Sequence, residues 1–402
     1  MNTVASPSSL RRYDVDALRV IVFGGLIAYH LAMAYVADWG WHVKSAYQAE
    51  WLQVPMMAIN RWRMPLLFLL SGLAIGLFQP ARNPWRFLKD RTVRLLLPLA
   101  FGMAVIVPVQ AYCQGVSNGK VAPGFVAFLA DYFSFQPWPA GAFDGSDVGI
   151  TWNHLWYLPY LWVYTLLLGG LLPLLESRAG RAVMARVASL AWPSKLLLLA
   201  LWIWGAMMLL ARDWPQANNL FADWYQHAVF FVVFLSGYAM ARGGSDPDRL
   251  ARARRPLLWV AVVLGAIHVA FAMAAPDGLQ GVPLATLRLS RALYTAAAML
   301  AALAWARALL NRPWRWLPYA TEAVFPWYML HQSLIVVLVF VLAPMELGPV
   351  AEPLLVLLGT VVGCGLLHHA LIRRSPVLRP LFGLKPLRTP ARTPAATAPT
   401  HA

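Results

Sequence analysis

Long runs of apolar residues, separated by short polar loops, dominate this sequence. Ten of these runs approach the length of about 20 apolar residues that a helix needs to cross a bilayer. The pattern therefore predicts an all-α integral membrane protein, a polytopic bundle of about ten transmembrane helices. The predicted spans are 17–36, 54–79, 95–112, 154–175, 195–211, 225–241, 257–275, 289–310, 320–344 and 352–372.

Polar segments flank this apolar region at both ends. Residues 1–13 form a short polar arm, and residues 376–402 form a tail whose Pro/Thr/Ala-rich end is typical of disorder. We expect residues 14–375 to be one transmembrane domain. Between its predicted spans, the basic and aromatic segment 79–94 is typical of an amphipathic helix on the membrane surface. Two short Ser-Gly pairs, at 71–72 and 236–237, indicate close helix packing, with an internal duplication as the alternative.

Composition supports the membrane assignment and explains the charge. Apolar residues make up 60% of the chain and charged residues 12%, about half the share of an ordinary soluble domain. The net charge of +16 is unevenly placed, because Lys and Arg gather in the N-terminal arm and in every second loop. Cytoplasmic loops carry such an excess, so both termini are predicted to be cytoplasmic. The basic balance therefore reports topology, and we expect no nucleic-acid partner.

One polar pair stands out within the first predicted span. Arg19 and His30 are eleven residues apart, which is almost three helical turns and about 16 Å along the axis. Ionisable residues at membrane depth are costly and usually mark a functional path. The alternative for Arg19 is a simple ion pair with Asp16 at the membrane rim. We expect a polar track that runs from Arg19 towards His30.

A second basic pair precedes a proline in the second span. On a regular helix Arg61 and Arg63 would point about 200° apart, and one ligand could not contact both. Pro65 disfavours helix at Met64, which would leave 61–64 extended or kinked. Both arginines could then bind one phosphate or carboxylate. The alternative is that they anchor the span at the headgroups.

Two further spans carry polar residues of interest. The fourth opens with His154 and Trp156 at the outer boundary, where the aromatic belt alone accounts for a Trp. The ninth contains Glu322 near the cytoplasmic rim and His331 about 13 Å further along the helix. These residues predict a second polar lining, with packing as the alternative for each.

The sequence contains no motif for a disulfide framework, a metal site or the common soluble-enzyme active sites. The two cysteines, Cys113 and Cys364, form no disulfide framework and have no metal-ligand spacing. His368 and His369 are adjacent and diverge by about 100° on a helix, which makes a metal site improbable. We find no Gly-rich phosphate loop, His-Glu-x-x-His motif or Gly-x-Ser-x-Gly motif. We therefore expect no metal and no tightly bound cofactor.

Taken together, the polar motifs resemble those of the membrane acyltransferase 3 family. The resemblance covers about residues 12–372 and follows the same order along the chain. Its elements are Asp16-x-x-Arg19 with His30, Arg61-x-Arg63-Met-Pro-x-x-Phe-x-x-Ser-Gly72, Arg91-x-x-Arg94-Leu-Leu-x-Pro98, His154-Leu-Trp-Tyr-Leu and Glu322-x-x-Phe-Pro-x-Tyr-x-x-His331. Within the family, Trp41-His42-Val43 resembles the glucan biosynthesis protein C subgroup, which implies succinyl transfer onto periplasmic glucans.

This resemblance implies a membrane O-acyltransferase in the bacterial inner membrane. It would move an acetyl or succinyl group from cytoplasmic acyl-CoA to a hydroxyl of a cell-envelope carbohydrate. We assign His30 as general base, Arg19 to a CoA phosphate or the thioester carbonyl, and Glu322 to a histidine or the donor. Expected substrate-binding residues are Arg63, Arg61, His154, Trp156, His331 and Asp16. The competing prediction is a transporter or flippase, in which the same charges line a proton or anion path.

Overall fold

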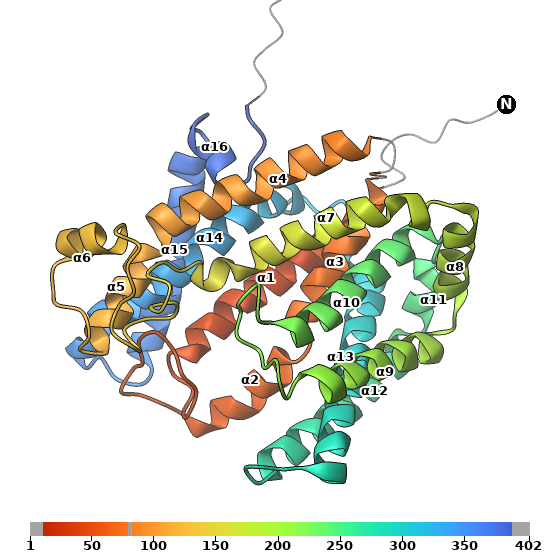
Figure 1. Cartoon of the computed structure of the whole chain (residues 1–402), viewed down its shortest axis with the longest axis horizontal. Helices are drawn as coiled ribbons and strands as arrows, with labels where there is room; N and C mark the ends of the chain where they lie inside the picture. Colours follow the sequence, from red (N-terminus) through yellow and green to blue (C-terminus); the bar gives the residue numbers. More distant parts are fainter. Residues whose placement is uncertain (1–10, 79, 81–82, 388–402) are drawn as a thin grey trace, which may run out of the picture.

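The computed structural model describes residues 11–78, 80 and 83–387, and these form a helical bundle (Figure 1). No strand occurs in these ranges, which contain sixteen α-helices. The first eight are α1 (Tyr13–Met33), α2 (Gln53–Asn60), α3 (Arg63–Leu77), α4 (Pro84–Phe101), α5 (Pro108–Ser117), α6 (Phe125–Tyr132), α7 (Tyr157–Leu175) and α8 (Arg178–Ser189). The others are α9 (Trp192–Leu210), α10 (Trp224–Arg242), α11 (Pro247–Arg252), α12 (Arg254–Ala274), α13 (Gly281–Leu310), α14 (Leu317–Leu342), α15 (Ala351–Leu366) and α16 (Leu378–Leu381).

The long helices confirm a polytopic membrane protein. In the described part of the chain, seven helices are long and apolar enough to cross a bilayer, or eight if the bent pair α4–α5 is one span. Two predicted spans fall short of that standard. One corresponds to α2 and the 15-residue α3, and the other to α10, which opens with the polar sequence Trp-Tyr-Gln-His. The structure thus supports a helical membrane bundle with seven or eight such spans.

Helix α1 lies in the interior of the bundle, which explains how it carries polar residues. It contacts α3, α13 and α14, and it crosses the centre of the view in Figure 1. Its buried apolar residues, such as Leu18 and Leu26, belong to the main hydrophobic core. One polar residue of α1, His30, faces α14 and finds a partner there instead of facing lipid.

Helices α3 and α10 pack closely through two glycines. A Cβ at Gly72 would strike the carbonyl oxygen of Phe234, and a Cβ at Gly237 would strike that of Leu69. Each glycine thus admits the backbone of the opposite helix, as small residues do at membrane helix interfaces. The two Ser-Gly pairs recognised in the sequence are therefore the two sides of one helix crossing.

Three local features differ from the simplest reading of the sequence. The second predicted span is divided at Arg61 and Trp62, whose backbones stay in the helical region, so the segment is kinked and not extended. Helix α4 continues without a break from the 79–94 region into the next span. Part of the 376–402 tail also packs on the bundle, since α16 is helical and Phe382 contacts Phe101. Residues 388–402 and 1–10 lie outside the described residues.

Candidate active site

A large cavity opens among the C-terminal end of α1, the break between α2 and α3, and the loops that follow α6 and α9. Its volume is about 840 Å³, within the range of roughly 300–1,000 Å³ typical of ligand pockets. Its wall includes His30 from α1 and Gln332 from α14. The helices also bring Arg61, Arg63 and Arg291 to the same cavity. A histidine and three arginines therefore face one space large enough for a substrate.

His30 forms a hydrogen bond with His331 of α14. The His30 Nδ1 and His331 Nε2 atoms are 2.9 Å apart, and the ring planes differ by only 6°. Stacked rings would keep their atoms about 3.5–4.0 Å apart, so these rings must lie edge to edge. The contact therefore runs close to both ring planes, the direction in which an imidazole N–H and lone pair point.

The partners of His331 determine which nitrogen of each ring carries the proton. His331 Nδ1 lies 3.0 Å from the Trp327 carbonyl oxygen and 2.9 Å from that of Tyr328, both of which can only accept. His331 therefore donates from Nδ1 and accepts at Nε2. His30 must then donate from Nδ1, which leaves a lone pair on its Nε2. This is the protonation state that a general base needs.

A third histidine, His154, packs beside this pair. Its Nε2 donates to the backbone carbonyls of Tyr328 and Met329, at 3.1 Å each, and its Nδ1 accepts from Gln110. Its ring meets the His331 ring edge to face, with centroids 5.4 Å apart. The same carbonyl of Tyr328 thus receives hydrogen bonds from both rings. His154 fixes α14 against the start of α7 and so holds His331 in place.

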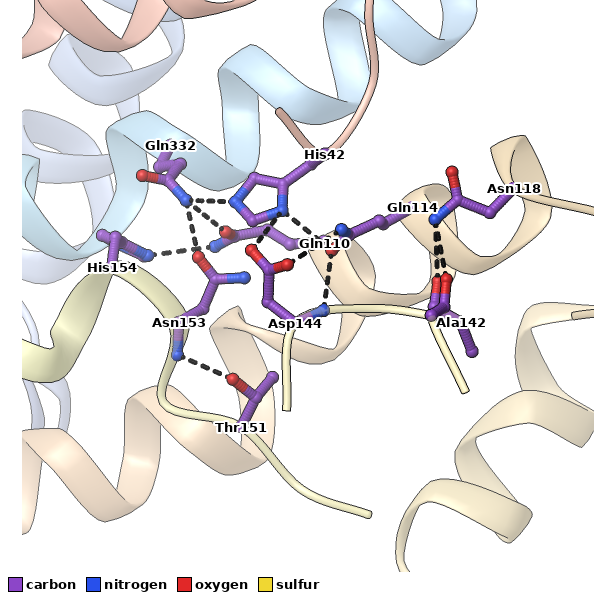
Figure 2. Close-up of polar contacts among 11 residues, drawn as sticks. His42, Gln110, Gln114, Asn118, Ala142, Asp144, Thr151, Asn153, His154 and Gln332 are labelled. Carbon is purple, nitrogen blue, oxygen red and sulfur yellow. Dashed lines mark hydrogen bonds and ion pairs between the residues drawn. The ribbon is translucent and has the colours of Figure 1, made fainter. Parts of the chain in front are cut away.

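A network of amide side chains surrounds His42 and extends to His154 (Figure 2). The Gln332 Nε2 atom lies 2.8, 3.0 and 2.6 Å from His42 Nε2, Gln110 Oε1 and Asn153 Oδ1, and its two hydrogens are shared among these three acceptors. Asn153 has a left-handed backbone with φ of 46°, a conformation that Asn tolerates better than most residues. The network ties the loop before α7 to α14. It thereby positions one wall of the cavity.

The loop that carries Asp144 joins the same network. His42 Nδ1 lies 2.8 Å from the side-chain oxygen of Gln114 and 3.3 Å from the Asp144 carboxylate. The backbone N–H of Asp144 also donates to Gln114. These contacts, drawn in Figure 2, fasten the loop to α5. The loops that line the cavity are therefore held by a specific set of polar side chains.

Arg63 packs against the ring of Tyr29, the residue that precedes His30 in the sequence. Its guanidinium carbon is 3.5 Å from the ring centre of Tyr29, a cation–π contact, and its Nη2 donates to Asn60 at 3.3 Å. Its Nε and Nη1 atoms are buried and have no partner among the described residues. Buried donors without partners are uncommon. A ligand in the cavity could accept from them.

Arg19 lies towards the other end of α1, away from the cavity. It forms an ion pair with Asp16 at 2.9 Å, and Asp16 also pairs with Arg11. Arg91 and Arg94 of α4 are close enough to Arg19 for their charges to interact. The structure thus gathers three arginines at the N-terminal end of α1. They form a second basic region, separate from the cavity, which we call the Arg19 cluster (Arg19, Arg91 and Arg94).

Glu322 belongs to a third group of side chains. Its carboxylate pairs with Arg379 at 3.0 Å and with Arg373 at 3.6 Å. It therefore connects α14 to the segment around α16. His331 has its own partners in His30 and the backbone. The contacts of Glu322 therefore favour a role near the start of α14, and they do not indicate that Glu322 positions His331.

The structure brings together most, but not all, of the predicted site residues. His30, Arg61, Arg63, His154 and Trp156 line the cavity, and His331 lies directly behind His30. Arg19, Asp16 and Glu322 are outside its wall. Sequence reasoning missed Gln110, Asp144 and Arg291, and it used His42 only in the resemblance to a subgroup. Within the described ranges, no group of His, Cys, Asp and Glu side chains could hold a metal ion.

Comparisons with known proteins give one family match and several weakly similar relatives. A family model described as an acyltransferase domain matches residues 12–369. Glucans biosynthesis protein C of Escherichia coli K12 is 25% identical over 163 residues, which are 39% of this chain and 38% of that protein. The protein of the same name from Escherichia coli O1:K1 / APEC has the same identity and coverage. The alignment thus spans less than half the length of these curated relatives. No solved structure gives a significant match.

Proposed function

The protein belongs to the acyltransferase 3 family, whose model matches nearly the whole chain, and we propose that it transfers an acyl group to a carbohydrate hydroxyl. The donor in this proposal is a cytoplasmic acyl-CoA, carrying a succinyl or acetyl group. The acceptor is a carbohydrate on the other side of the bacterial inner membrane. Similarity to glucans biosynthesis protein C favours a periplasmic glucan as this acceptor.

The contact between His30 and His331 is the observation that carries the proposal. It leaves the His30 Nε2 lone pair available in a ring that lines the cavity. In the proposed reaction, Nε2 takes the proton of the acceptor hydroxyl as the oxygen attacks the thioester carbonyl carbon. The tetrahedral intermediate then loses the CoA thiolate, and the proton on His30 passes to that sulfur. Proton transfer by a positioned base typically contributes about 10²–10⁴-fold.

Arg63 is the proposed electrostatic partner of this reaction. Its Nε and Nη1 donors have no partner among the described residues, its guanidinium packs against Tyr29, the residue before His30, and both Arg63 and His30 line the cavity. A negative charge develops on the carbonyl oxygen as the hydroxyl attacks. Donors fixed in advance around that oxygen stabilise the transition state more than the ground state. We assign Arg63 to this oxygen and His331 to the orientation of His30.

The Arg19 cluster is the proposed site of the donor phosphates. The distribution of Lys and Arg along the chain predicts that this end of α1 faces the cytoplasm, where CoA esters are found. Arg91 and Arg94 add two cations to Arg19, and guanidinium groups bind phosphate well. The donor then approaches His30 from the Arg19 side and the acceptor enters through the cavity. Arg19, Asp16 and Glu322 are in this view donor-side residues.

Acyl transfer by the purified protein tests the proposal. Wild-type protein in vesicles is supplied with acyl-CoA and an oligosaccharide on opposite sides of the membrane, and mass spectrometry detects the ester. We expect an acylated sugar and free CoA in equal amounts. Movement of either substrate across the membrane without an ester would instead favour the transporter or flippase.

A further inference from the structure

Two arginines meet in the cavity from distant parts of the chain. Arg61 lies at the break between α2 and α3, and Arg291 lies in the third turn of α13. Both side chains line the cavity, and their charges are close enough to repel each other. The proposed reaction assigns a task to Arg63 but none to this pair.

Two hydrogen bonds hold α13, which carries Arg291, against the break that carries Arg61. The Thr295 hydroxyl, one turn after Arg291, donates to the Arg61 carbonyl oxygen at 3.3 Å. The Tyr294 hydroxyl donates to the Ala58 carbonyl oxygen at 3.0 Å. Residues four apart share one face of a helix, so the Arg291 side of α13 faces the break. This packing of α13 on the break brings both arginines to the wall of one cavity.

Neither arginine has a counter-ion among the described residues. The ion pairs of the structure include neither guanidinium, and the Arg61 Nε is buried with no partner. The cavity wall also contains Asp144, which is engaged with His42 and Gln114, and Asp147, which forms no ion pair with either arginine among the described residues. Two unpaired cations at one place destabilise the empty site. An anion would relieve both the repulsion and the missing hydrogen bonds.

We propose that Arg61 and Arg291 form an anion-binding subsite for a carboxylate or phosphate carried by a substrate. This inference extends the proposed function by giving one substrate a negative charge. The charge has two possible sources, the free carboxylate of a dicarboxylic acyl group or an anionic substituent of the acceptor sugar. Arg291 then selects the substrate, while His30 and Arg63 carry out the transfer.

Binding of simple anions tests the subsite without any acyl transfer. The full chain in nanodiscs is titrated with succinate and glucose 6-phosphate, and with the neutral compounds succinamide and glucose, by calorimetry. Arg291→Gln removes the charge and keeps some hydrogen bonding. Arg288→Gln removes a charge from the same helix at a residue outside the cavity wall. We expect at least one anion, but neither neutral compound, to bind the wild type.

The expected effect of Arg291→Gln is a loss of anion affinity of about 10- to 100-fold, the cost of removing a charged hydrogen-bond donor. Arg288→Gln should bind as the wild type does. The proposal fails if the wild type binds neither anion or if Arg291→Gln binds normally. It also fails if Arg291→Gln and Arg291→Lys both unfold, because Arg291 would then be structural.

A second arm identifies the source of the charge. If the anion belongs to the donor, Arg291→Gln lowers kcat/KM with succinyl-CoA but not with acetyl-CoA. If it belongs to the acceptor, the variant lowers kcat/KM for an anionic sugar with either donor. The two donors are each paired with an anionic and with a neutral sugar. An equal effect of Arg291→Gln in all four pairings would contradict a role of Arg291 in substrate selection. Anion binding by a wild type that transfers no acyl group would refute the proposed function and leave the subsite intact.

Discussion

His30 Nδ1 and His331 Nε2 lie 2.9 Å apart, although the two residues are 301 positions apart in the chain and belong to different helices. The His331 ring is in turn anchored on carbonyl oxygens of its own helix. This sequence of hydrogen bonds fixes both the direction of the His30 ring and the nitrogen that holds its proton. His331 therefore acts as a positioning residue for the base.

Replacing His331 tests this positioning role. His331→Ala removes the acceptor for the His30 N–H, and loss of a partner that orients a histidine typically costs about 10- to 100-fold. We expect kcat to fall by about that factor while KM for both substrates changes little. Steady-state kinetics with purified protein provide the measurement.

His331→Gln is the matched rescue variant, because its amide oxygen can still accept from the His30 N–H. It should recover part of the lost kcat. Equal rates for His331→Ala and wild type would remove His331 from the account. Equal losses in the Ala and Gln variants would indicate a packing role instead.

The Arg19 cluster predicts a selective effect on the donor. Arg91→Gln removes a cation that we assign to the CoA phosphates, and we expect KM for acyl-CoA to rise about tenfold. KM for the acceptor should be unchanged. Arg86→Gln is the control on the same helix, since Arg86 is 79% exposed and makes only a long ion pair with Asp90. If only the KM for the acceptor rises, the assignment of Arg91 to the donor is wrong.

Glu176 gives the protein a predictable dependence on pH. Hydrogen bonds from Arg242 hold the pKa of Glu176 below its ordinary value, and Glu176 lies just beyond the end of α7. A depressed pKa stabilises the fold above the unfolded-state pKa of about 4.3, and this contribution is lost as the pH falls through the folded-state value. At neutral pH, Glu176→Gln should therefore lower the melting temperature.

The comparison between pH values isolates the charge of Glu176. At pH 7 we expect wild type to melt about 2–4 °C above Glu176→Gln. The difference should shrink as the pH falls below about 4, because Glu176 then becomes neutral, as glutamine is at every pH. Asp90→Asn, in the exposed pair with Arg86, should change the melting temperature little at any pH. A difference that grows on acidification would contradict the assignment.

The glycine crossing between α3 and α10 predicts a stability effect. In Gly72→Ala the new methyl group would meet the Phe234 carbonyl oxygen, which cannot move without its helix. Such overpacking typically costs about 1–3 kcal/mol. Gly205→Ala in α9 is the control, since a Cβ there meets nothing within 4 Å. Thermal unfolding should show a loss for Gly72→Ala and none for Gly205→Ala.

Helical periodicity predicted much of the fold but only part of the candidate site. The eleven-residue spacing correctly put Arg19 and His30 in one helix, and the polar run of the ninth span put Glu322 and His331 in another. Spacing within a helix gives no information on which helices touch. The hydrogen bond between His30 and His331 could not be predicted for that reason.

Arg291 is a second residue whose place in the site could not be predicted from the sequence. In the sequence it is one arginine near the start of an apolar span, where a headgroup anchor is the ordinary interpretation. Only the packing of α13 against the break at Arg61 brings it into the cavity. The kink at that break was foreseen from Pro65, but its direction depends on Tyr294 and Thr295, which are distant in the chain.

The central claim, that His30 is the general base, is tested most directly by the rate of acyl transfer from acyl-CoA by purified His30→Ala protein. We predict that kcat falls by about 10²–10⁴-fold, with protein level and melting temperature close to wild type. His369→Ala, which changes an exposed histidine outside the cavity, should keep the full rate. A normal kcat in His30→Ala would contradict the account.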